Sequence, residues 1–150
     1  MADSHINLSI KRLSDQAVIP QYATAGSAGM DLHACIEEPM VIGPGQRVKV
    51  PTGLAIALPT PDYAAFLFPR SGLGVQSGIT LPNCVGVVDS DYRGEVIVGL
   101  VNLSQEAYTV QPGDRIAQMV ILPVAHAHIQ VVEELDDTQR GAGGFGSTGK

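Results

Sequence analysis

The sequence has few cysteines and no run of apolar residues long enough to cross a membrane. Its two cysteines, Cys35 and Cys84, lie in apolar surroundings without the spacing of a metal site or a redox motif, so they are expected to be reduced core residues. The N-terminus also lacks the pattern of a signal peptide. A cytoplasmic location and no membrane partner are therefore expected.

Charged residues are scarce, and basic ones most of all. They make up 16% of the chain, with 9 Lys or Arg against 15 Asp or Glu and a net charge of −6. A protein that binds a nucleic-acid polymer usually carries a basic face, so DNA and RNA are not expected as main partners. A small anionic ligand is compatible with this charge if local arginines or a metal ion meet it. The large neutral surface indicates subunit contacts.

Helical periodicity is nearly absent. The 150 residues are enough for one domain with a core of its own. Short apolar or alternating segments recur between turns that use the 17 glycines and 10 prolines, which is typical of an antiparallel β-sandwich or barrel. One short helix is expected at 71–76, three strands between 41 and 58, and further strands at 7–12, 30–34, 64–68, 96–102, 107–110 and 115–121.

The stretch 83–95 is the strongest candidate for chemistry. Two apolar runs, Val85–Val88 and 96–98, are expected to be buried strands joined by a hairpin. The polar segment between them is partly explained as a turn, because Asp, Ser and Gly are turn formers. A turn does not explain Asp89, which follows the valine-rich run at the mouth of a buried strand, where a carboxylate loses hydration. We interpret Asp89 as a general base that takes a proton from water.

A second candidate lies at Arg70-Ser71-Gly72, after the strand 64–68. A guanidinium, a hydroxyl and the free N–H groups of a helix start meet there, which predicts an anion site. Asp31 is expected to cap the glycine-rich loop before it or, as a slightly less favoured alternative, to orient a basic side chain or a metal-bound water. Gln118 is embedded in an apolar strand and needs a partner, which is either backbone or ligand.

The residues after Asp137 change in character. The segment 140–150 holds five glycines and Phe145, so it cannot supply the core of a strand or helix. It is either a flexible tail or a lid that stacks its aromatic ring on a flat ligand. Before it, His126 and His128 are expected to share one strand face as surface residues rather than metal ligands.

Five stretches of the chain together resemble the homotrimeric dUTPases, the dUTP pyrophosphatases. They match the five motifs of that family in order, over nearly the whole chain: Ala28–Leu32, Pro69–Leu73, Asn83–Gly94, Gly113–Gln118 and Arg140–Gly149. Each motif alone is a moderate signal, whereas five in the right order are a strong one.

The resemblance implies a jelly-roll-like antiparallel β fold of the dUTPase-like β-clip type. Residues 1–137 would form the β domain, and residues 138–150 a flexible arm that closes over the active site. It also implies a homotrimer whose active sites are each assembled from all three chains. The implied reaction is the Mg²⁺-dependent hydrolysis of dUTP to dUMP and pyrophosphate by water attack on the α-phosphorus. This reaction limits uracil in DNA and supplies dUMP for dTMP synthesis.

The resemblance further assigns roles to single residues. Asp89 is implied to be the general base, and Tyr92 to select deoxyribose by packing where a 2′-hydroxyl would lie. The uracil base is implied to contact Asn83, the backbone of Gly86, Val87 and Val88, and the ring of Phe145. The phosphates are implied to be held by Arg70, Ser71, Gly72 and Gln118 and closed over by Arg140, Gly146 and Ser147. Mg²⁺ is implied to bind phosphate oxygens and water, with no direct protein ligand and Asp31 only in its outer sphere.

Two other functions stay open at this point. A dCTP deaminase-like enzyme would share the fold and the triphosphate site but attack the base, and it should place an acid beside the pyrimidine edge. This chain has Asn83 and backbone at that place in its motif. The second alternative, a non-catalytic trimeric module that binds nucleotides, is disfavoured by the presence of Asp89 and of the complete tail motif.

Overall fold

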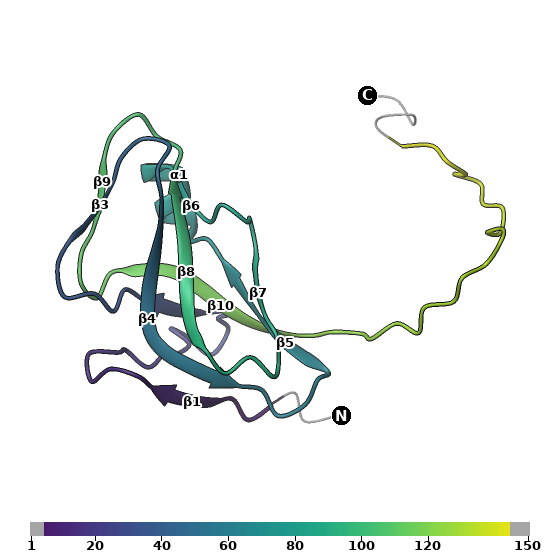
Figure 1. Ribbon diagram of the computed structural model, residues 1–150, viewed down its shortest axis with the longest axis horizontal. Helices are drawn as coiled ribbons and strands as arrows, with labels where there is room; N and C mark the ends of the chain where they lie inside the picture. Colours follow the sequence, from purple (N-terminus) through teal and green to yellow (C-terminus); the bar gives the residue numbers. More distant parts are fainter. Residues whose placement is uncertain (1–4, 145–150) are drawn as a thin grey trace.

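The computed structural model describes residues 5–144, which form an antiparallel β protein with one short helix (Figure 1). The elements in chain order are β1 (Ser9–Arg12), β2 (Met30–His33), β3 (Met40–Ile42), β4 (Arg47–Ala57), β5 (Tyr63–Phe68), α1 (Ser71–Ser77), β6 (Ile79–Thr80), β7 (Gly86–Val88), β8 (Glu95–Asn102), β9 (Tyr108–Val110) and β10 (Arg115–Pro123). The predicted all-β class and the predicted short helix are confirmed. No helix in this described range is long and apolar enough to cross a membrane.

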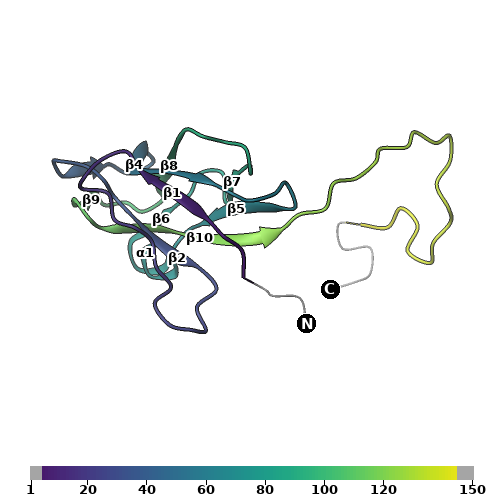
Figure 2. The same cartoon turned by 90° about the horizontal axis from the view of Figure 1, so that it is seen from below.

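Two four-stranded sheets enclose the hydrophobic core. One has the order β1-β4-β8-β6 and the other β2-β10-β5-β7, while β3 and β9 form a two-stranded sheet beside them (Figures 1 and 2). The alternation predicted for β2 is present, because Met30 and Leu32 are buried whereas Asp31 and His33 are half-buried. Burying each large core side chain stabilises the fold by about 1.5–3 kcal/mol. The fully buried set includes Leu32, Ile42, Leu54, Val98, Leu100, Ile116 and Met119.

The predicted hairpin between the two valine-rich runs is wrong. β7 pairs with β5, through Leu67 opposite Gly86, whereas β8 pairs with β4 and β6 in the other sheet. The segment between β7 and β8 therefore crosses from one sheet to the other over the edge of the core. An apolar run indicates a strand but does not identify its partner strand, which is why the sequence did not reveal the crossing.

The prediction of three strands between residues 41 and 58 is also wrong, because Pro51-Thr52-Gly53 does not end a strand. β4 runs through this tripeptide with an irregularity, and its register against β8 shifts between Pro51 and Ala55. Gly53 has a φ of 68°, and the Thr52 hydroxyl donates to the Val96 carbonyl at 2.6 Å. Residues typical of turns thus form a bulge inside a long strand.

Cys84 is exposed, which contradicts its prediction as a core residue. It lies in the loop before β7 with a φ of 63°, a left-handed conformation that is uncommon for a residue with a side chain. Cys35 is half-buried and packs against the core, as expected. Both thiols are free.

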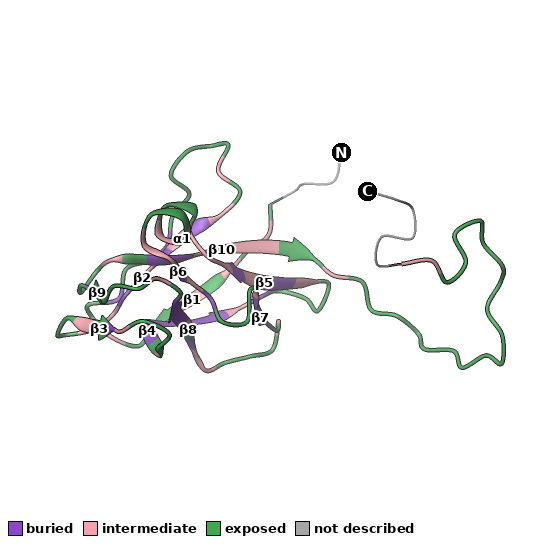
Figure 3. Ribbon diagram, turned by 90° about the horizontal axis from the view of Figure 1, so that it is seen from above, coloured by how far each residue is buried: buried purple, intermediate pink, exposed green. Residues whose placement is uncertain are grey.

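After β10 the chain leaves the sheets. Residues 125–142 are exposed and extend away from the β body, and they have no strand (Figures 1 and 3). The expectation that His126 and His128 share a strand face is therefore wrong, although both are on the surface as predicted. The His126 ring lies 2.9 Å from the Pro61 carbonyl, Nε2 to oxygen, near the point where the segment departs.

Candidate active site

A pocket of about 250 Å³ lies between the end of β7 and the start of β8. Six of the residues predicted for the site line it: Asn83, Gly86, Val87, Val88, Asp89 and Tyr92. The rest of its wall is formed by residues of β5, of β8 and of the loop before β7: Leu67, Leu81, Glu95, Val96, Ile97 and Gly99. The crossing between the sheets creates this pocket, because it separates β7 from β8 and leaves a space between them.

The floor of the pocket is formed by β7, which is the last strand of its sheet. Val88 turns into the core, whereas the apolar side chain of Val87 is 61% exposed. Gly86 lies directly against Leu67, where an added Cβ would be 3.1 Å from the Leu67 Cβ. A side chain at position 86 would require Leu67 to shift by a few tenths of an ångström. β5 pairs with one edge of β7, and no described strand pairs with the other edge, whose N–H and C=O groups can therefore bind a polar ligand edge.

Asp89 follows β7 directly, and its side chain is exposed in the single chain. The expected loss of hydration is therefore wrong for the chain by itself. The reason is that β7 ends at the rim of its sheet rather than inside the core. The Asp89 backbone is ordered by a turn, in which its carbonyl accepts the Tyr92 N–H at 3.2 Å.

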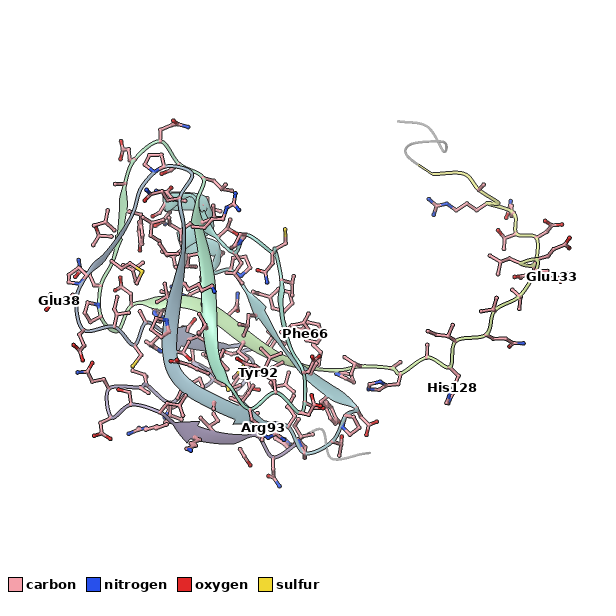
Figure 4. All side chains as sticks on the ribbon, in the orientation of Figure 1. Glu38, Phe66, Tyr92, Arg93, His128 and Glu133 are labelled. Atoms are coloured by element: carbon pink, nitrogen blue, oxygen red, sulfur yellow. The ribbon has the colours of Figure 1, made fainter. Side chains whose placement is uncertain are left out.

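Tyr92 also lines the pocket. Its hydroxyl donates to the Glu95 carbonyl at 3.1 Å. The neighbouring Arg93 guanidinium donates from Nη1 to the carbonyls of Ser90 at 2.8 Å and Tyr92 at 3.1 Å. Figure 4 shows Tyr92 and Arg93 close together on the segment that leads into β8. These hydrogen bonds all lie within residues 90–95 and stabilise the loop between β7 and β8.

A second cluster gathers around Asp31 on the neighbouring strands. Its Oδ1 accepts the Arg70 Nε at 2.9 Å, and its Oδ2 lies 3.4 Å from Arg115 Nη1. The side chains of Asp31 and Arg70 are only 26% and 25% exposed. Asp31 thus orients basic side chains, which was the less favoured of its two predicted roles. Arg115 was not predicted as a site residue, although its place beside a glycine turn is a signal that could have identified it.

The register of the sheet explains this cluster. Gln118 of β10 lies opposite Asp31 of β2 on one side and opposite Phe68 of β5 on the other. The Gln118 amide Nε2 donates to the Pro69 carbonyl at 3.1 Å, so the backbone is the partner that its burial required. Arg70 follows at once, and Ser71 and Gly72 open α1 as exposed residues. An added Cβ at Gly72 would meet no atom within 4 Å, so the space above it is open.

The two clusters are separate within one chain. None of Arg70, Ser71, Gly72 and Gln118 is among the described residues that line the pocket. Arg140 lies on the exposed segment beyond β10, where its Nε donates to the Gly143 carbonyl at 3.0 Å. Phe145, Gly146 and Ser147 lie outside the described residues. Within residues 5–144 no three His, Cys, Asp or Glu side chains come together in a group that could hold a metal ion.

Glu95 is a pocket residue that the sequence reasoning missed. Its Oε1 accepts the Gly53 N–H at 2.8 Å, across from β8 to the bulge of β4. A carboxylate in addition to Asp89 thus lines the pocket, although one of its oxygens already accepts a backbone hydrogen bond. No local sequence pattern indicates this contact, because the two residues are 42 positions apart.

The fold and the two clusters define a jelly-roll-like β protein with a pocket at the end of β7 and a separate cluster of Asp31, Arg70 and Arg115. The chain belongs to the dUTPase family, whose model matches residues 15–149. It is 57% identical over 139 residues to the deoxyuridine 5′-triphosphate nucleotidohydrolase of Neisseria meningitidis serogroup A, covering 93% of this chain and 91% of that protein. It is 49% identical over 150 residues to the protein of that name from Idiomarina loihiensis, covering 100% of this chain and 99% of that protein.

Solved structures of the family share the fold. The dUTPase of Staphylococcus bacteriophage 80alpha, solved with dUpNHpp, superposes with a TM-score of 0.87 at 26% identity, covering 96% of this chain and 99% of that chain. A dUTPase variant from phage phi11 of S. aureus, described with a structural Mg(II) ion, superposes with a TM-score of 0.78 at 22% identity, covering 87% of this chain and 99% of that chain. The predicted family and the predicted jelly-roll-like fold are confirmed.

Proposed function

We propose that the protein is a dUTP diphosphatase that hydrolyses dUTP to dUMP and pyrophosphate. Membership of the dUTPase family supports the reaction. The pocket at the end of β7 is the observation that locates this reaction in the molecule. Asn83, the exposed Val87 and Asp89 line it together.

The outer edge of β7 suits a uracil ring. Uracil presents a donor at N3 between two carbonyl acceptors, and the edge of a strand offers alternating N–H donors and C=O acceptors. The Asn83 amide adds a donor and an acceptor at the same pocket. Cytosine carries an amine where uracil has its second carbonyl, so it would face an N–H with another donor. A mismatched buried polar pair of this kind is strongly rejected.

Asp89 is proposed as the general base. Its carboxylate would take a proton from a bound water, whose oxygen attacks the α-phosphorus in line with the leaving oxygen. The new bond joins the water oxygen to the α-phosphorus. The bond from the α-phosphorus to the bridging oxygen breaks, and pyrophosphate leaves with that oxygen. The proton on Asp89 passes to solvent, which restores the carboxylate for the next turnover.

The triphosphate is proposed to lie along Arg70, Ser71, Gly72 and Gln118. Arg70 is held in place by Asp31, so its Nε is engaged and the outer guanidinium nitrogens stay available for phosphate oxygens. Ser71 and Gly72 add a hydroxyl and open backbone at the start of α1. Mg²⁺, if bound, would be held by the substrate phosphates and water rather than by protein side chains, and it would supply charge neutralisation at the leaving group. This fits a site in which Asp31 is already paired with arginines.

A homotrimer with shared active sites is proposed for the assembly. The base pocket and the phosphate cluster are separate within one chain, so neighbouring chains would bring them together. The exposed segment after β10 supports this, since Ile129, Val131 and Leu135 are 92%, 93% and 86% exposed. Apolar side chains exposed in a row usually mark a surface that packs against a partner. Residues 1–137 would then be the β domain, and residues 138–150 the arm that closes a site.

Product analysis tests the reaction. The protein is incubated with dUTP, dCTP or UTP and Mg²⁺ in water enriched in ¹⁸O, and the products are identified by mass spectrometry. The expected products are dUMP carrying one ¹⁸O and unlabelled pyrophosphate from dUTP, with little turnover of UTP and dCTP. Label in the pyrophosphate would contradict attack on the α-phosphorus. A deaminated product from dCTP would favour the deaminase alternative, and no turnover of any nucleotide would favour a binding module.

A further inference from the structure

The ring of Tyr92 is folded back over the residue that follows Arg93. An added Cβ at Gly94 would collide with the Tyr92 hydroxyl and would lie 2.6 Å from the Tyr92 Cζ. The ring thus occupies the space that a side chain at position 94 would need. Its hydroxyl donates to the Glu95 carbonyl at 3.1 Å, one residue further on. The position of the ring therefore depends on where the Glu95 peptide lies.

The Glu95 peptide is fixed by contacts with the bulge of β4. The Glu95 carboxylate accepts the Gly53 N–H at 2.8 Å, in a half-buried position. The next carbonyl along, that of Val96, accepts the hydroxyl of Thr52, which is 1% exposed. The side chain of Glu95 and the backbone of Val96 thus bind two successive residues of the bulge.

The bulge itself has little freedom to move. The Gly53 carbonyl accepts the Leu13 N–H at 2.7 Å. An added Cβ at Gly53 would lie 2.7 Å from the Cys35 sulfur and 2.8 Å from the Ala17 Cβ, so neighbouring atoms fill the space on that side. Gly53 also has a φ of 68°, which a residue with a side chain adopts only under strain. A carboxylate bound to Gly53 is therefore held by a rigid part of the core.

We propose that Glu95 is a positioning residue that sets sugar selectivity through Tyr92. The inference rests on the proposed function and on the role that the family resemblance implies for Tyr92, whose ring would occupy the place of a ribose 2′-hydroxyl. Steric exclusion of a hydroxyl works only if the excluding ring cannot retreat, because a ring that moves aside admits the larger sugar. The link from Gly53 through Glu95 to the Tyr92 hydroxyl prevents that retreat. The charge of Glu95 is not required, since the amide oxygen of a glutamine can accept the same N–H.

A set of variants tests this chain of contacts: Glu95→Ala, Glu95→Gln, Tyr92→Phe and the double variant Glu95→Ala/Tyr92→Phe. Glu38→Ala is the matched control, because Glu38 is an exposed glutamate far from Tyr92 (Figure 4). The measurement is kcat/KM for UTP divided by kcat/KM for dUTP. Circular dichroism and gel filtration check that each variant folds and assembles like the parent.

Glu95→Ala and Tyr92→Phe are each expected to raise the UTP to dUTP ratio by about 2- to 12-fold, the range for one net hydrogen bond. Glu95→Gln is expected to stay close to the parent protein. The double variant is expected to show no larger ratio than the stronger single one, because both changes break the same link. A purely structural role for Glu95 would lower both activities together and leave their ratio unchanged.

The proposal is overturned if Glu95→Ala has the ratio of Glu38→Ala, or if the two single effects multiply in the double variant. If Glu95→Ala does not fold, Tyr92→Phe decides, since an unchanged ratio in that variant removes the hydroxyl from sugar selection. The activity of the parent protein on dUTP distinguishes a failure of this proposal from a failure of the proposed function. Failure of the parent to hydrolyse dUTP overturns the function itself, whereas dUTP hydrolysis with unmoved ratios overturns only the role of Glu95.

Discussion

The Asp31 carboxylate accepts a hydrogen bond from the inner nitrogen of the Arg70 guanidinium, with 2.9 Å between Oδ1 and Nε. Both side chains are about three-quarters buried, so their hydrogen bond lies largely out of solvent. Because Nε is the inner nitrogen of the guanidinium, this contact fixes the direction in which the two outer nitrogens point. It joins the first two family motifs into one unit, and it gives Asp31 a role that does not require a metal ion.

Replacing Asp31 with asparagine should weaken the hold on Arg70 while keeping the shape of the side chain. We expect KM for dUTP to rise by roughly 10-fold, the scale for a hydrogen bond to a charged group, with a smaller effect on kcat. Asp62→Asn, on the exposed loop before β5, serves as the control. A normal KM in Asp31→Asn would show that Arg70 needs no support from Asp31.

Replacing Asp89 with asparagine should remove the proposed base without removing the pocket. Asp89 is exposed and its carboxylate is not needed by the core, so folding and binding of a non-hydrolysable dUTP analogue should persist. Turnover should fall by roughly 10² to 10⁴-fold, the usual contribution of a general base. Single-turnover kinetics with calorimetric binding separate the two effects. Turnover near that of the parent would exclude Asp89 as the base, and Asp91 would be the next residue to replace.

Removing the residues after Asp137 should strongly reduce catalysis without destabilising the fold. Residues 138–142 are exposed and contribute nothing to the core, so the melting temperature should stay unchanged. The proposed closure of the arm over the triphosphate excludes water and aligns the α-phosphorus, so its loss should lower kcat/KM strongly. Calorimetry, gel filtration and steady-state kinetics on the shortened chain check these outcomes. Full activity after the deletion would show that the arm takes no part in the reaction.

Tyr108 should make stability depend on pH in the alkaline range. Burial, reinforced by the negative charge of Asp114 and opposed by Arg70, raises the pKa of Tyr108 above its ordinary value of 10.0. A raised pKa means that the folded state holds the proton more tightly than the unfolded state. The stabilisation is therefore complete below about pH 10 and is lost as the pH rises through the folded pKa.

Urea midpoints measured from about pH 8 to pH 11 test this expectation, because the midpoint reports stability at each pH. The midpoint of the parent protein should decline above pH 10, and the decline should be shallower in Tyr108→Phe. Tyr22→Phe is the control, since Tyr22 is 53% exposed and lies on a loop. Equal slopes in the parent protein and Tyr108→Phe would assign the alkaline loss to other groups.

The sequence predicted the local features of the fold well, because alternation and turn residues act over short distances. The inward Met30 and Leu32, the helix at residues 71–77 and the long strand around Gln118 all follow from such patterns. Pairing between strands was harder to predict. The run that ends at Val88 and the run that begins at Val96 look like a hairpin, yet each finds its partners in a different sheet.

The same limit applies to the site. Asp31 lies 39 positions from Arg70 and 84 from Arg115, and only the register of β2, β10 and β5 brings them together. Glu95 meets Gly53 for a comparable reason, since a bulge in β4 turns its N–H toward β8. Motifs identify which residues take part, whereas contacts between them depend on strand registers that no single motif contains.

The extended course of residues 125–142 has a consequence for assemblies that mix two variants of the chain. In the proposed homotrimer, a segment that leaves its own sheets and exposes Ile129 and Val131 would serve a neighbouring chain, so two different defects could lie in different subunits. Chains with Asp89→Asn keep the arm of residues 138–150, and chains cut after Asp137 keep the proposed general base Asp89. Refolded together in equal amounts, they should complement each other and recover activity in about a quarter of the sites if chains assemble at random. Recovery would not occur if each arm closed only over the pocket of its own chain.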